Sequence, residues 1–432
     1  MVWKLPERLQ VGRHSVSNLG GFMRLISCAI LAAAVSGCDG GTQVSQPSET
    51  RSPRSPAARY NVEKLASLGG AQSRGMAIND AGRVAGWSDQ SDGSRRAAWW
   101  KGRSVHRLGT LGGPSSSVPW PGQNNSGMIV GISQTDKVDP LDEEWACELG
   151  GFLPETTDLI CGGFVWENNK MRELPTLGGH HGFAAGVNDR RQIVGWAETS
   201  LEDDTCSPLA TQVLQFRAVL WEPKKGLQGP ITTRELRPFR DASTSAATAI
   251  NNHGQAVGIS GDCDQGVGRF SARYAVLWDE NGGVSEIPNL GGTSWHTPMD
   301  INDQGDVVGF SNPDEPGDEI GDFISRAFFW GYGAATAKDL GTLDEDPVSE
   351  AFAINSSRQV VGISFGTPGV GPRAFIWEND ALTDLNDLVD ISPDTLLSAQ
   401  DINDAGQITG RVRDHASGEV LAFVATPIRS DR

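Results

Sequence analysis

Short runs of alternating apolar and polar residues, separated by turns rich in Gly and Asn, occupy the chain from about residue 60 to residue 427. In the run RAFIW, alternation places Phe375 and Trp377 on one face of a strand and Ala374 and Ile376 on the other. Asn, Asp and Gly at the turns tolerate the left-handed backbone angles that tight hairpins require. The pattern predicts an all-β protein built from short antiparallel strands.

One block of sequence recurs seven times, for example as AINDAGRVAG from Ala77 and DINDAGQITG from Asp401. Each unit contains a strand ending in Ile-Asn, a Val-Val-Gly strand, an Ala-Phe-x-Trp strand and a last strand that often ends in Leu-Gly-Gly. Four strands per unit with loops of variable length are typical of a propeller blade. A residue that is present in every unit is expected to have a structural role. The repeated asparagines are such residues: Asn79, Asn124, Asn188, Asn251, Asn302, Asn355 and Asn403.

The two ends of the repeat region complement each other. The seventh unit ends after a third strand, LAFVATPI, whereas residues 60–70 (YNVEKLASLGG) match the fourth-strand text RSVHRLGTLGG. The N-terminal strand would then complete the last blade, which closes a ring and removes exposed sheet edges, whereas a solenoid would need polar caps. We predict one seven-bladed β-propeller of four-stranded blades over residues 60–427, with a short tail at 428–432.

An export signal precedes the repeats. Met23 and Arg24 are followed by the apolar run LISCAILAAAV and by SGC, which ends at Cys38. A basic start, a short apolar run and small residues before the cut are typical of a secretory signal, and the ending resembles a bacterial lipobox. We predict a signal peptide over 1–37, with Met23 as an alternative start, a lipid on Cys38, and a disordered Ser/Pro-rich tether over 38–59. A plain signal peptide or a short membrane anchor is the alternative.

The repeats resemble those of the HAF-repeat family, which are predicted extracellular repeat proteins. Leu-Gly-Gly, Ile-Asn-x-x-Gly and Ala-Phe-x-Trp recur in fixed order over residues 60–427, and the first two units depart most at the third strand, with AAW ending at Trp99 and GFVW ending at Trp166. The resemblance implies a location outside the cytoplasm and a repeat architecture, but no particular activity. The tripeptide that names the family appears as Arg326-Ala327-Phe328, Arg373-Ala374-Phe375 and Leu421-Ala422-Phe423.

The charge balance narrows the class of partner. The chain has 36 Lys and Arg against 54 Asp and Glu, a formal net charge of −18 at pH 7. We expect no nucleic-acid partner, because such binding depends on Lys and Arg neutralising phosphates. Much of the excess acid falls in insertions between second and third strands, as in NPDEPGDEIGD. Ca²⁺ is therefore a candidate cofactor, although no D-x-D-x-D-G loop is present; a solvated acidic rim is the alternative.

Four cysteines lie in the same insertions, which the topology places on one face. In an exported protein they favour disulfides, for which three pairings exist. We favour one disulfide within the second unit and one between the third and fourth units. A Zn²⁺ site is the alternative, but CxxC spacing and paired His are absent. The favoured pairs are Cys147–Cys161 and Cys206–Cys263.

Residues that break the repeat are the better candidates for a site. Most units place small residues after Leu-Gly-Gly, at the mouth of the predicted channel, but three units carry Trp120, His180 with His181, and Trp295 with His296. Aromatic and imidazole groups that converge on a funnel can hold a ligand; ordinary surface residues are the alternative. No Ser/His/Asp signature, phosphate-binding Gly loop or HExxH motif is present, so we assign no catalytic residue.

These features predict a non-enzymatic binding or scaffolding module, anchored outside the cytoplasm to a bacterial membrane, in the periplasm or at the cell surface. Its partner would be a protein or glycan of the cell envelope. The alternative is an envelope hydrolase or lyase in the funnel, which would use His181 or His296 with a neighbouring carboxylate, with or without a divalent cation.

Overall fold

The computed structural model describes residues 59–143, 152–154, 157–207, 211–224, 229–263, 268, 270–314, 324–344 and 346–428. The predicted signal peptide, Cys38 and nearly all of the tether lie outside these residues, as does Cys147, so the predictions about them stay predictions. The described elements are strands and one short 3-10 helix, η3 (Leu385–Leu388). No helix in this part of the chain is long and apolar enough to cross a membrane. The all-β prediction is confirmed.

Five sheets each contain four antiparallel strands that follow one another in the chain. The first two are β6 (Gly112–Ser117), β7 (Ile129–Val138), β8 (Leu159–Glu167) and β9 (Lys170–Glu173), then β10 (Gly178–Val187), β11 (Ile193–Glu202), β12 (Leu214–Pro223) and β13 (Ile231–Leu236). The third and fourth are β14 (Thr244–Ile250), β15 (Ala256–Gly261), β16 (Tyr274–Trp278) and β17 (Val284–Glu286), then β18 (Thr297–Ile301), β19 (Val307–Ser311), β20 (Arg326–Trp330) and β21 (Lys338–Asp339). The fifth is β22 (Val348–Ile354), β23 (Val360–Phe365), β24 (Arg373–Glu378) and β25 (Ala381–Asp384).

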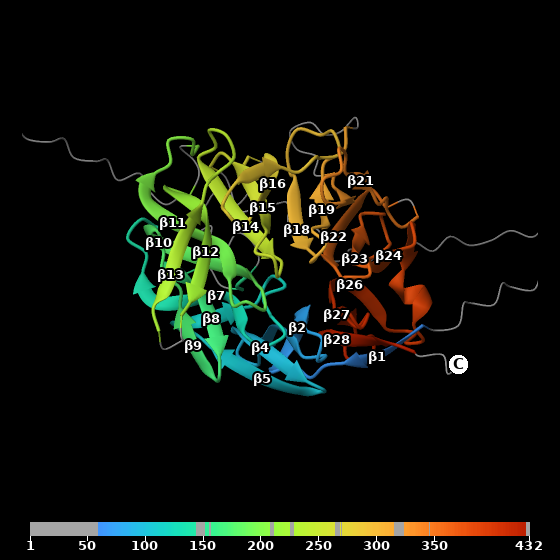
Figure 1. The fold of residues 1–432 in the computed structure, drawn as a ribbon. Coiled ribbons are helices and arrows are strands. Elements are labelled where there is room, and N and C mark those ends of the chain that lie inside the picture. The colour runs from blue at the N-terminus through green and yellow to red at the C-terminus, as the bar shows by residue number, and fades with distance from the viewer. Residues whose placement is uncertain are drawn as a thin grey trace, which may run out of the picture. The chain divides into compact units, whose positions relative to one another are not determined.

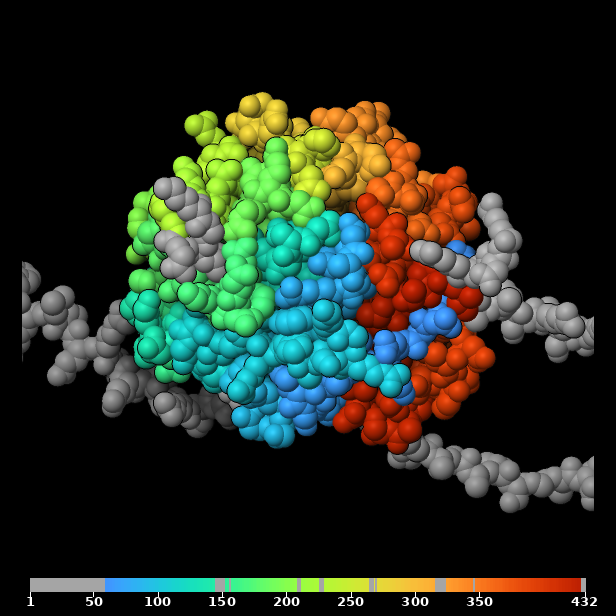
Figure 2. All heavy atoms as spheres, turned by 60° about the horizontal axis from the view of Figure 1, so that its bottom comes forward, coloured from blue at the N-terminus to red at the C-terminus, as the bar shows by residue number. Residues whose placement is uncertain are grey.

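A further sheet joins the two ends of the repeat region. A single parallel pair, Gln72 with Val420, links its two four-stranded groups. β1 pairs antiparallel with β28, with Tyr60 opposite Pro427. The first and last strands of the repeat region therefore lie side by side, as the space-filling view also shows (Figure 2). One group is β2 (Gly69–Ile78), β3 (Val84–Gln90), β4 (Arg95–Lys101) and β5 (Ser104–Gly109); the other is β26 (Thr395–Ile402), β27 (Ile408–Arg413), β28 (Val420–Pro427) and β1 (Tyr60–Lys64).

The first strand of each four-stranded group, β26 in the last group, is here called the inner strand; except for β6, which ends at Ser117, it ends directly before the repeated Asn. In Figure 1, β2, β14, β18, β22 and β26 lie around a common centre. The repeated Gly on the second strand lets the two strands approach: a Cβ at Gly258 would lie 2.0 Å from the carbonyl oxygen of Ala246. Beside it the register shifts between Ala247 and Ala249, which marks a β-bulge on the inner strand. The repeated Gly is therefore a packing requirement.

Apolar cores lie between neighbouring sheets. One such core joins Val194, Leu220 and Leu236 of one sheet with Ala247 and Trp278 of the next. The Trp278 ring is fully buried and its Nε1 donates a hydrogen bond to the Arg237 carbonyl at 2.7 Å. The third-strand Trp is thus a core residue, as predicted from its repetition.

The seven repeated asparagines form a cyclic series of hydrogen bonds. Each side-chain amide donates to the backbone carbonyl of the Asn in the next unit, and Asn403 donates to the carbonyl of Asn79 at 2.9 Å. Each Oδ1 also accepts the N–H four residues later, as between Asn188 and Gln192 at 2.9 Å. The turn after each inner strand is therefore fastened both internally and to its neighbour. The bonds run 79 to 124, 124 to 188, 188 to 251, 251 to 302, 302 to 355, 355 to 403 and 403 to 79.

The sheet topology separates the loops into two ends. Turns between first and second strands, and between third and fourth strands, lie at one end of each antiparallel sheet. Loops between second and third strands lie at the other end, with the connections between sheets. We define the insertion face by the described parts of three such loops, 139–158, 203–213 and 262–273.

Candidate functional site

Three of the five residues predicted to line a funnel are interior side chains. Trp120 is 8% exposed, His181 0% and His296 1%. Trp120 packs edge-on against Phe183, with ring centroids 5.5 Å apart, in one apolar cluster. His180 and Trp295 are half-buried, and Trp295 precedes β18, two sheets further along the chain than β10. A role in ligand binding stays a prediction for all five.

One ring nitrogen of His181, on β10, accepts a hydrogen bond, and the other is buried without a hydrogen-bond partner among the described residues. The backbone N–H of Cys161 donates to Nδ1 at 3.1 Å, and Nε2 lies 3.4 Å from Asp139 Oδ2. Because Nδ1 accepts a hydrogen bond, the ring hydrogen of the neutral imidazole is on Nε2, facing the carboxylate. His181 therefore fastens β8, β10 and the loop after β7 to one another.

His296 is held in the same manner by groups of its own unit. Its Nε2 lies 3.1 Å from the amide nitrogen of Asn289, and its Nδ1 lies 2.7 Å from Ser311 Oγ. Since the amide nitrogen can only donate, Nε2 accepts and Nδ1 carries the hydrogen. His296 therefore has no free ring nitrogen, and the unbonded Nε2 of His181 is buried beside Asp139.

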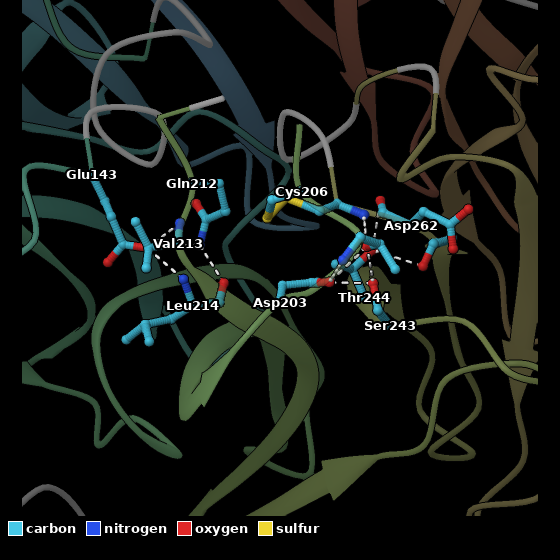
Figure 3. The surroundings of a disulfide bond; sticks show 12 residues. Glu143, Asp203, Cys206, Gln212, Val213, Leu214, Ser243, Thr244 and Asp262 are labelled. Atoms are coloured by element: carbon cyan, nitrogen blue, oxygen red, sulfur yellow. Dashed lines mark hydrogen bonds between the residues drawn. A yellow bond between two sulfur atoms is a disulfide. The ribbon is translucent and has the colours of Figure 1, made fainter. Parts of the chain in front are cut away.

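Three carboxylates surround His181. Glu143, from the insertion after β7, accepts backbone N–H bonds from Val213 and Leu214, both at 2.7 Å to Oε1 (Figure 3). Glu198, on β11, accepts the N–H of His181 at 2.8 Å. The third carboxylate is Asp139, which also accepts the N–H of Glu143. The insertion of one sheet is thereby attached to the start of β12 in the next.

Burial and mutual repulsion set the proton affinities of this cluster. Burial and the charge of Glu198 raise the pKa of Glu143 to about 7, against the two N–H donors. Burial alone would raise the pKa of Asp139, but the bonds from His181 and the Glu143 N–H lower it to about 2. Burial would likewise lower the pKa of His181, and the bond to Asp139 with the nearby Glu198 raises it. At neutral pH Glu143 is therefore only partly ionised.

The cluster has the composition of a cation site but not the hydrogen-bond pattern of one. One potential ligand atom each from Asp139, Glu143 and His181 lie within 4.8 Å of one another. Ca²⁺ takes oxygen ligands, so the imidazole does not suit it. A metal on His181 Nε2 would move the ring hydrogen to Nδ1, where it would face the N–H of Cys161. The Cys161 contact argues against a metal on His181, although Nε2 of His181 and Oε2 of Glu143 are buried without hydrogen-bond partners in the described part of the chain; a Ca²⁺ cofactor stays a prediction.

The insertion face is also cross-linked covalently. Cys206 and Cys263 form a disulfide that joins the loop after β11 to the loop after β15, as predicted (Figure 3). Beside it Asp203 accepts a hydrogen bond from Ser243 Oγ at 2.8 Å. A four-cysteine Zn²⁺ site is wrong, because these two sulfurs bond to each other. Cys161 is also disulfide-bonded; its pairing with Cys147 stays a prediction.

A surface pocket of about 530 Å³ lies along the outer strands near Trp99, His106 and Trp166. An exposed Trp can stack on a sugar, but the ring of Trp99 is covered on both faces. His106 stacks at 4.2 Å between centroids, and the Arg83 guanidinium lies 4.0 Å from the same centroid. These contacts give Trp99 a packing role.

Sequence reasoning missed the charged residues of the inner and second strands. The residue after the repeated second-strand Gly is Arg411 in the last unit. Arg74 and Glu350 share one position on the inner strands β2 and β22. A comparison of equivalent strand positions between the repeated units, like that of the loops, could have found all three. In the other six units the position of Arg411 is apolar: Trp87, Ile132, Trp196, Ile259, Phe310 and Ile363.

Two inner-strand aspartates also break the repeat, Asp300 on β18 and Asp401 on β26, where other units have Ala or Gly. Each accepts a backbone N–H from the inner strand of the following unit: Asp300 from Ile354 at 2.9 Å and Asp401 from Ile78 at 2.6 Å. Burial and the charge of Asp300 raise the pKa of Asp401 to about 8. These carboxylates link adjacent inner strands.

Comparison with known proteins gives remote likenesses only. No protein-family profile and no curated protein matches the chain. A Pyrococcus horikoshii acylaminoacyl peptidase is 11% identical, with 79% of this chain and 50% of that chain covered and a TM-score of 0.39. A Trypanosoma rangeli sialidase in complex with sialic acid is 10% identical, with 84% and 58% covered and a TM-score of 0.38. The chain thus spans half the length of the peptidase and 58% of the sialidase. An Aleuria aurantia lectin is 10% identical, with 85% and 100% covered and a TM-score of 0.30.

Proposed function

We propose that this chain is an exported bacterial lipoprotein of the HAF-repeat type, a closed seven-bladed β-propeller that acts as a non-enzymatic binding or scaffolding module in the cell envelope. Its ligand would be a protein or glycan that binds the insertion face. The lipid on Cys38 would hold it to the membrane.

Three observations support the closed ring. The Asn series of hydrogen bonds has no end, because Asn403 donates to Asn79. The strand β1 pairs with β28. β2 also packs against β26 and β27, so the first four-stranded group contacts the last one directly. Together these contacts join unit seven to unit one through side chains, backbone and packing.

Export is supported by the leader sequence and by the cysteines. The run before Cys38 has the composition of a secretory signal. The Cys206–Cys263 disulfide suits an oxidising compartment, since such bonds are rare in the cytosol.

The bracing of the insertion face is the observation that carries the binding role. Loops from three successive sheets are joined to each other, by Glu143 bonding to Val213 and Leu214 and by the Cys206–Cys263 disulfide. A loop that is held in one conformation loses less entropy when a ligand binds. Surface loops on a rigid scaffold are also where binding residues concentrate.

The hydrolase or lyase alternative draws no support from the histidines on which it depends. General acid–base catalysis requires a nitrogen within hydrogen-bond reach of the substrate. His181 and His296 are buried; both ring nitrogens of His296 and Nδ1 of His181 contact groups of the fold, and Nε2 of His181 lies beside Asp139 without a hydrogen bond.

Site-directed photo-crosslinking in the native cell tests the binding role. A photoreactive residue at the exposed Asp204, on the insertion face, should give a discrete adduct. The same residue at the exposed Glu280, in the turn between β16 and β17 at the opposite end of a sheet, is the matched control and should give none. Equal adducts from both positions, or none from Asp204, would contradict the proposal.

Mass spectrometry of the membrane fraction tests the anchor. We expect an N-terminal peptide that begins at an acylated Cys38. A Cys38→Ser chain should leave the membrane fraction while keeping its melting temperature. A chain that stays membrane-bound after this change, or that carries no acyl group, would rule the anchor out.

A further inference from the structure

The interior between the inner strands has an apolar side and a cationic side. One apolar cluster joins side chains from the five sheets β6–β9 to β22–β25, including Phe183 and Trp196. Among the described residues, the two remaining four-stranded groups contribute nothing to this cluster. At the repeat positions of Phe183 and Trp196 these groups carry Arg74, on β2, and Arg411, on β27. Arg411 thus breaks a position that is apolar in the six other units, whereas the position of Arg74 varies from unit to unit.

The two arginines lie on strands that pack against each other. β2 contacts β27, and a Cβ at Gly75, next to Arg74, would lie 2.0 Å from Thr409 Oγ1. Burial lowers the pKa of Arg74, and the positive charge of Arg411 lowers it further. Glu350 is the carboxylate whose charge acts on Arg74, yet no ion pair joins it to either arginine within the described residues. Glu350 acts on Arg74 alone, and no carboxylate of the described chain is among the charges that act on Arg411.

Two buried donor atoms on this side of the interior, one on Arg74 and one on Gln400, have no acceptor among the described residues. Arg74 makes no hydrogen bond to any described residue, and its Nε is buried. Gln400 is 3% exposed, and its Nε2 is also unpaired; it lies on β26, which pairs with β27 and packs against β2. Arg411 donates from Nε to Ser398 Oγ at 3.1 Å. Buried donors without acceptors are costly, so acceptor atoms of a ligand or of water would stabilise them.

We propose that Arg74 and Arg411, with the side-chain amide of Gln400, bind a small oxyanion between β2 and β27. A guanidinium presents its N–H groups in a planar fork that matches two oxygens of a carboxylate, sulfate or phosphate group. The anion would supply the missing acceptors and balance the second positive charge. The site is separate from the insertion face, so it adds a small-molecule ligand to the proposed binding role.

Calorimetric titration of the full-length protein, in a neutral detergent and a chloride-free buffer of low ionic strength, tests the proposal. The probes are sulfate and acetate at low millimolar concentration, which distinguish a tetrahedral oxyanion from a carboxylate. We expect one anion bound per chain. At a hundredfold excess over Kd it should raise the melting temperature by about 2–5 °C. No binding of either probe would overturn the proposal.

Variants that copy residues of the other units separate the site from a general salt effect. Arg411→Ile introduces the residue that Ile132 supplies at the same position in the second unit, and Arg74→Thr follows Thr297 of the fifth unit. Both should fold, melt no lower than the parent without ligand, and lose anion binding. Arg107→Ile removes the same charge from an exposed site on β5 and should keep binding.

The anion site and the insertion-face function are tested by separate experiments. An equal response to sulfate in Arg411→Ile and Arg107→Ile would mean surface exclusion of a kosmotropic ion rather than a site, and would overturn the inference. The photo-crosslink at Asp204 does not involve these arginines. If the chain with unchanged arginines gives no adduct at Asp204, the insertion-face function is contradicted and the anion site is unaffected.

Discussion

At the scale of single residues, each repeated asparagine side chain makes two kinds of hydrogen bond, one within its own turn and one to the next unit. The side chain of Asn188 accepts the N–H of Gln192 through Oδ1 and donates through Nδ2 to the carbonyl of Asn251. The residue is 4% exposed, so water cannot replace these bonds easily. An Asn is suited to this place because its amide is both donor and acceptor on a short side chain.

Replacing Asn188 by Ala should therefore lower the free energy of unfolding by about 2 kcal/mol, because a buried carbonyl and a buried N–H lose their partners. Urea denaturation followed by tryptophan fluorescence measures the change. Asn281→Ala, in the exposed turn between β16 and β17, is the control and should alter stability by less than about 0.5 kcal/mol. Equal effects of the two changes would argue against the role of the Asn series.

At the scale of elements, the insertion loops owe their conformation to cross-links between sheets. The loop after β11 is tied to the loop after β15 by Cys206–Cys263, with a sequence separation of 57 residues. In the chain-entropy account a closed loop of this size stabilises the fold by about 4 kcal/mol. The loops of this face are thus stabilised by long-range bonds rather than by strand pairing.

The double variant Cys206→Ala/Cys263→Ala should fold but melt several degrees below the parent, because the unfolded chain regains the freedom that the disulfide removes. Differential scanning calorimetry measures the shift. Dithiothreitol should lower the melting temperature of the parent more than that of the double variant, which keeps only the disulfide of Cys161. An unchanged parent under full reduction, verified by thiol titration, would contradict this account.

The first strand, β1, is the element on which the proposed ring depends. It pairs with β28 along its whole length, buries Tyr60, and its Lys64 forms ion pairs with Asp394 and Asp414 at 2.8 and 2.7 Å. Its removal would leave the edge of β28 unpaired, and exposed edges promote association.

A chain that starts after residue 64 should thus melt at least about 5 °C below the parent and form oligomers, on the scale of about 2–4 °C per kcal/mol for large domains. A chain that starts at Arg59, just before β1, is the control and should behave as the parent. Scanning fluorimetry and size-exclusion chromatography provide the two readouts. Equal melting of both truncations would show that β1 is dispensable.

At the scale of the whole molecule, buried acids make stability depend on pH. Burial raises the pKa of Asp401 to about 8 and the pKa of Glu143 and of Glu350 to about 7. Asp and Glu in an unfolded chain titrate near about pH 4. Between these values the folded protein retains protons that the unfolded chain releases. Their stabilising contribution is complete below about pH 4 and is lost as the pH rises toward about 8.

The melting temperature should therefore be higher at pH 5.5 than at pH 8, by several degrees. Scanning calorimetry in buffers of matched ionic strength measures it. Asp139 does not oppose this trend, because the pKa of about 2 places its titration below the range. Asp401→Asn should reduce the difference, and Asp204→Asn, at an exposed position, should not. A flat profile would show that these acids are solvated in the folded state.

The candidate sites illustrate what local sequence can and cannot reveal. Trp120 and His181 could be singled out because they interrupt a run of small residues, but their burial could not be predicted. The partner of His181 is Asp139, which belongs to another sheet. Arg74 and Arg411 stand at opposite ends of the chain, so no local pattern connects them. Their proximity follows from the packing of β2 on β27.

The strands, their grouping by four, and the structural role of the repeated Asn, Gly and Trp could all be predicted from the amino-acid sequence. Alternation and turn chemistry act over a few residues, and seven repetitions expose them. The packed sheets were needed to show that His181 and His296 are buried and that donors of Arg74 and Gln400 are unpaired within the described chain. Burial and hydrogen-bond satisfaction are properties of those packed sheets, because they depend on which distant segments exclude water from a side chain.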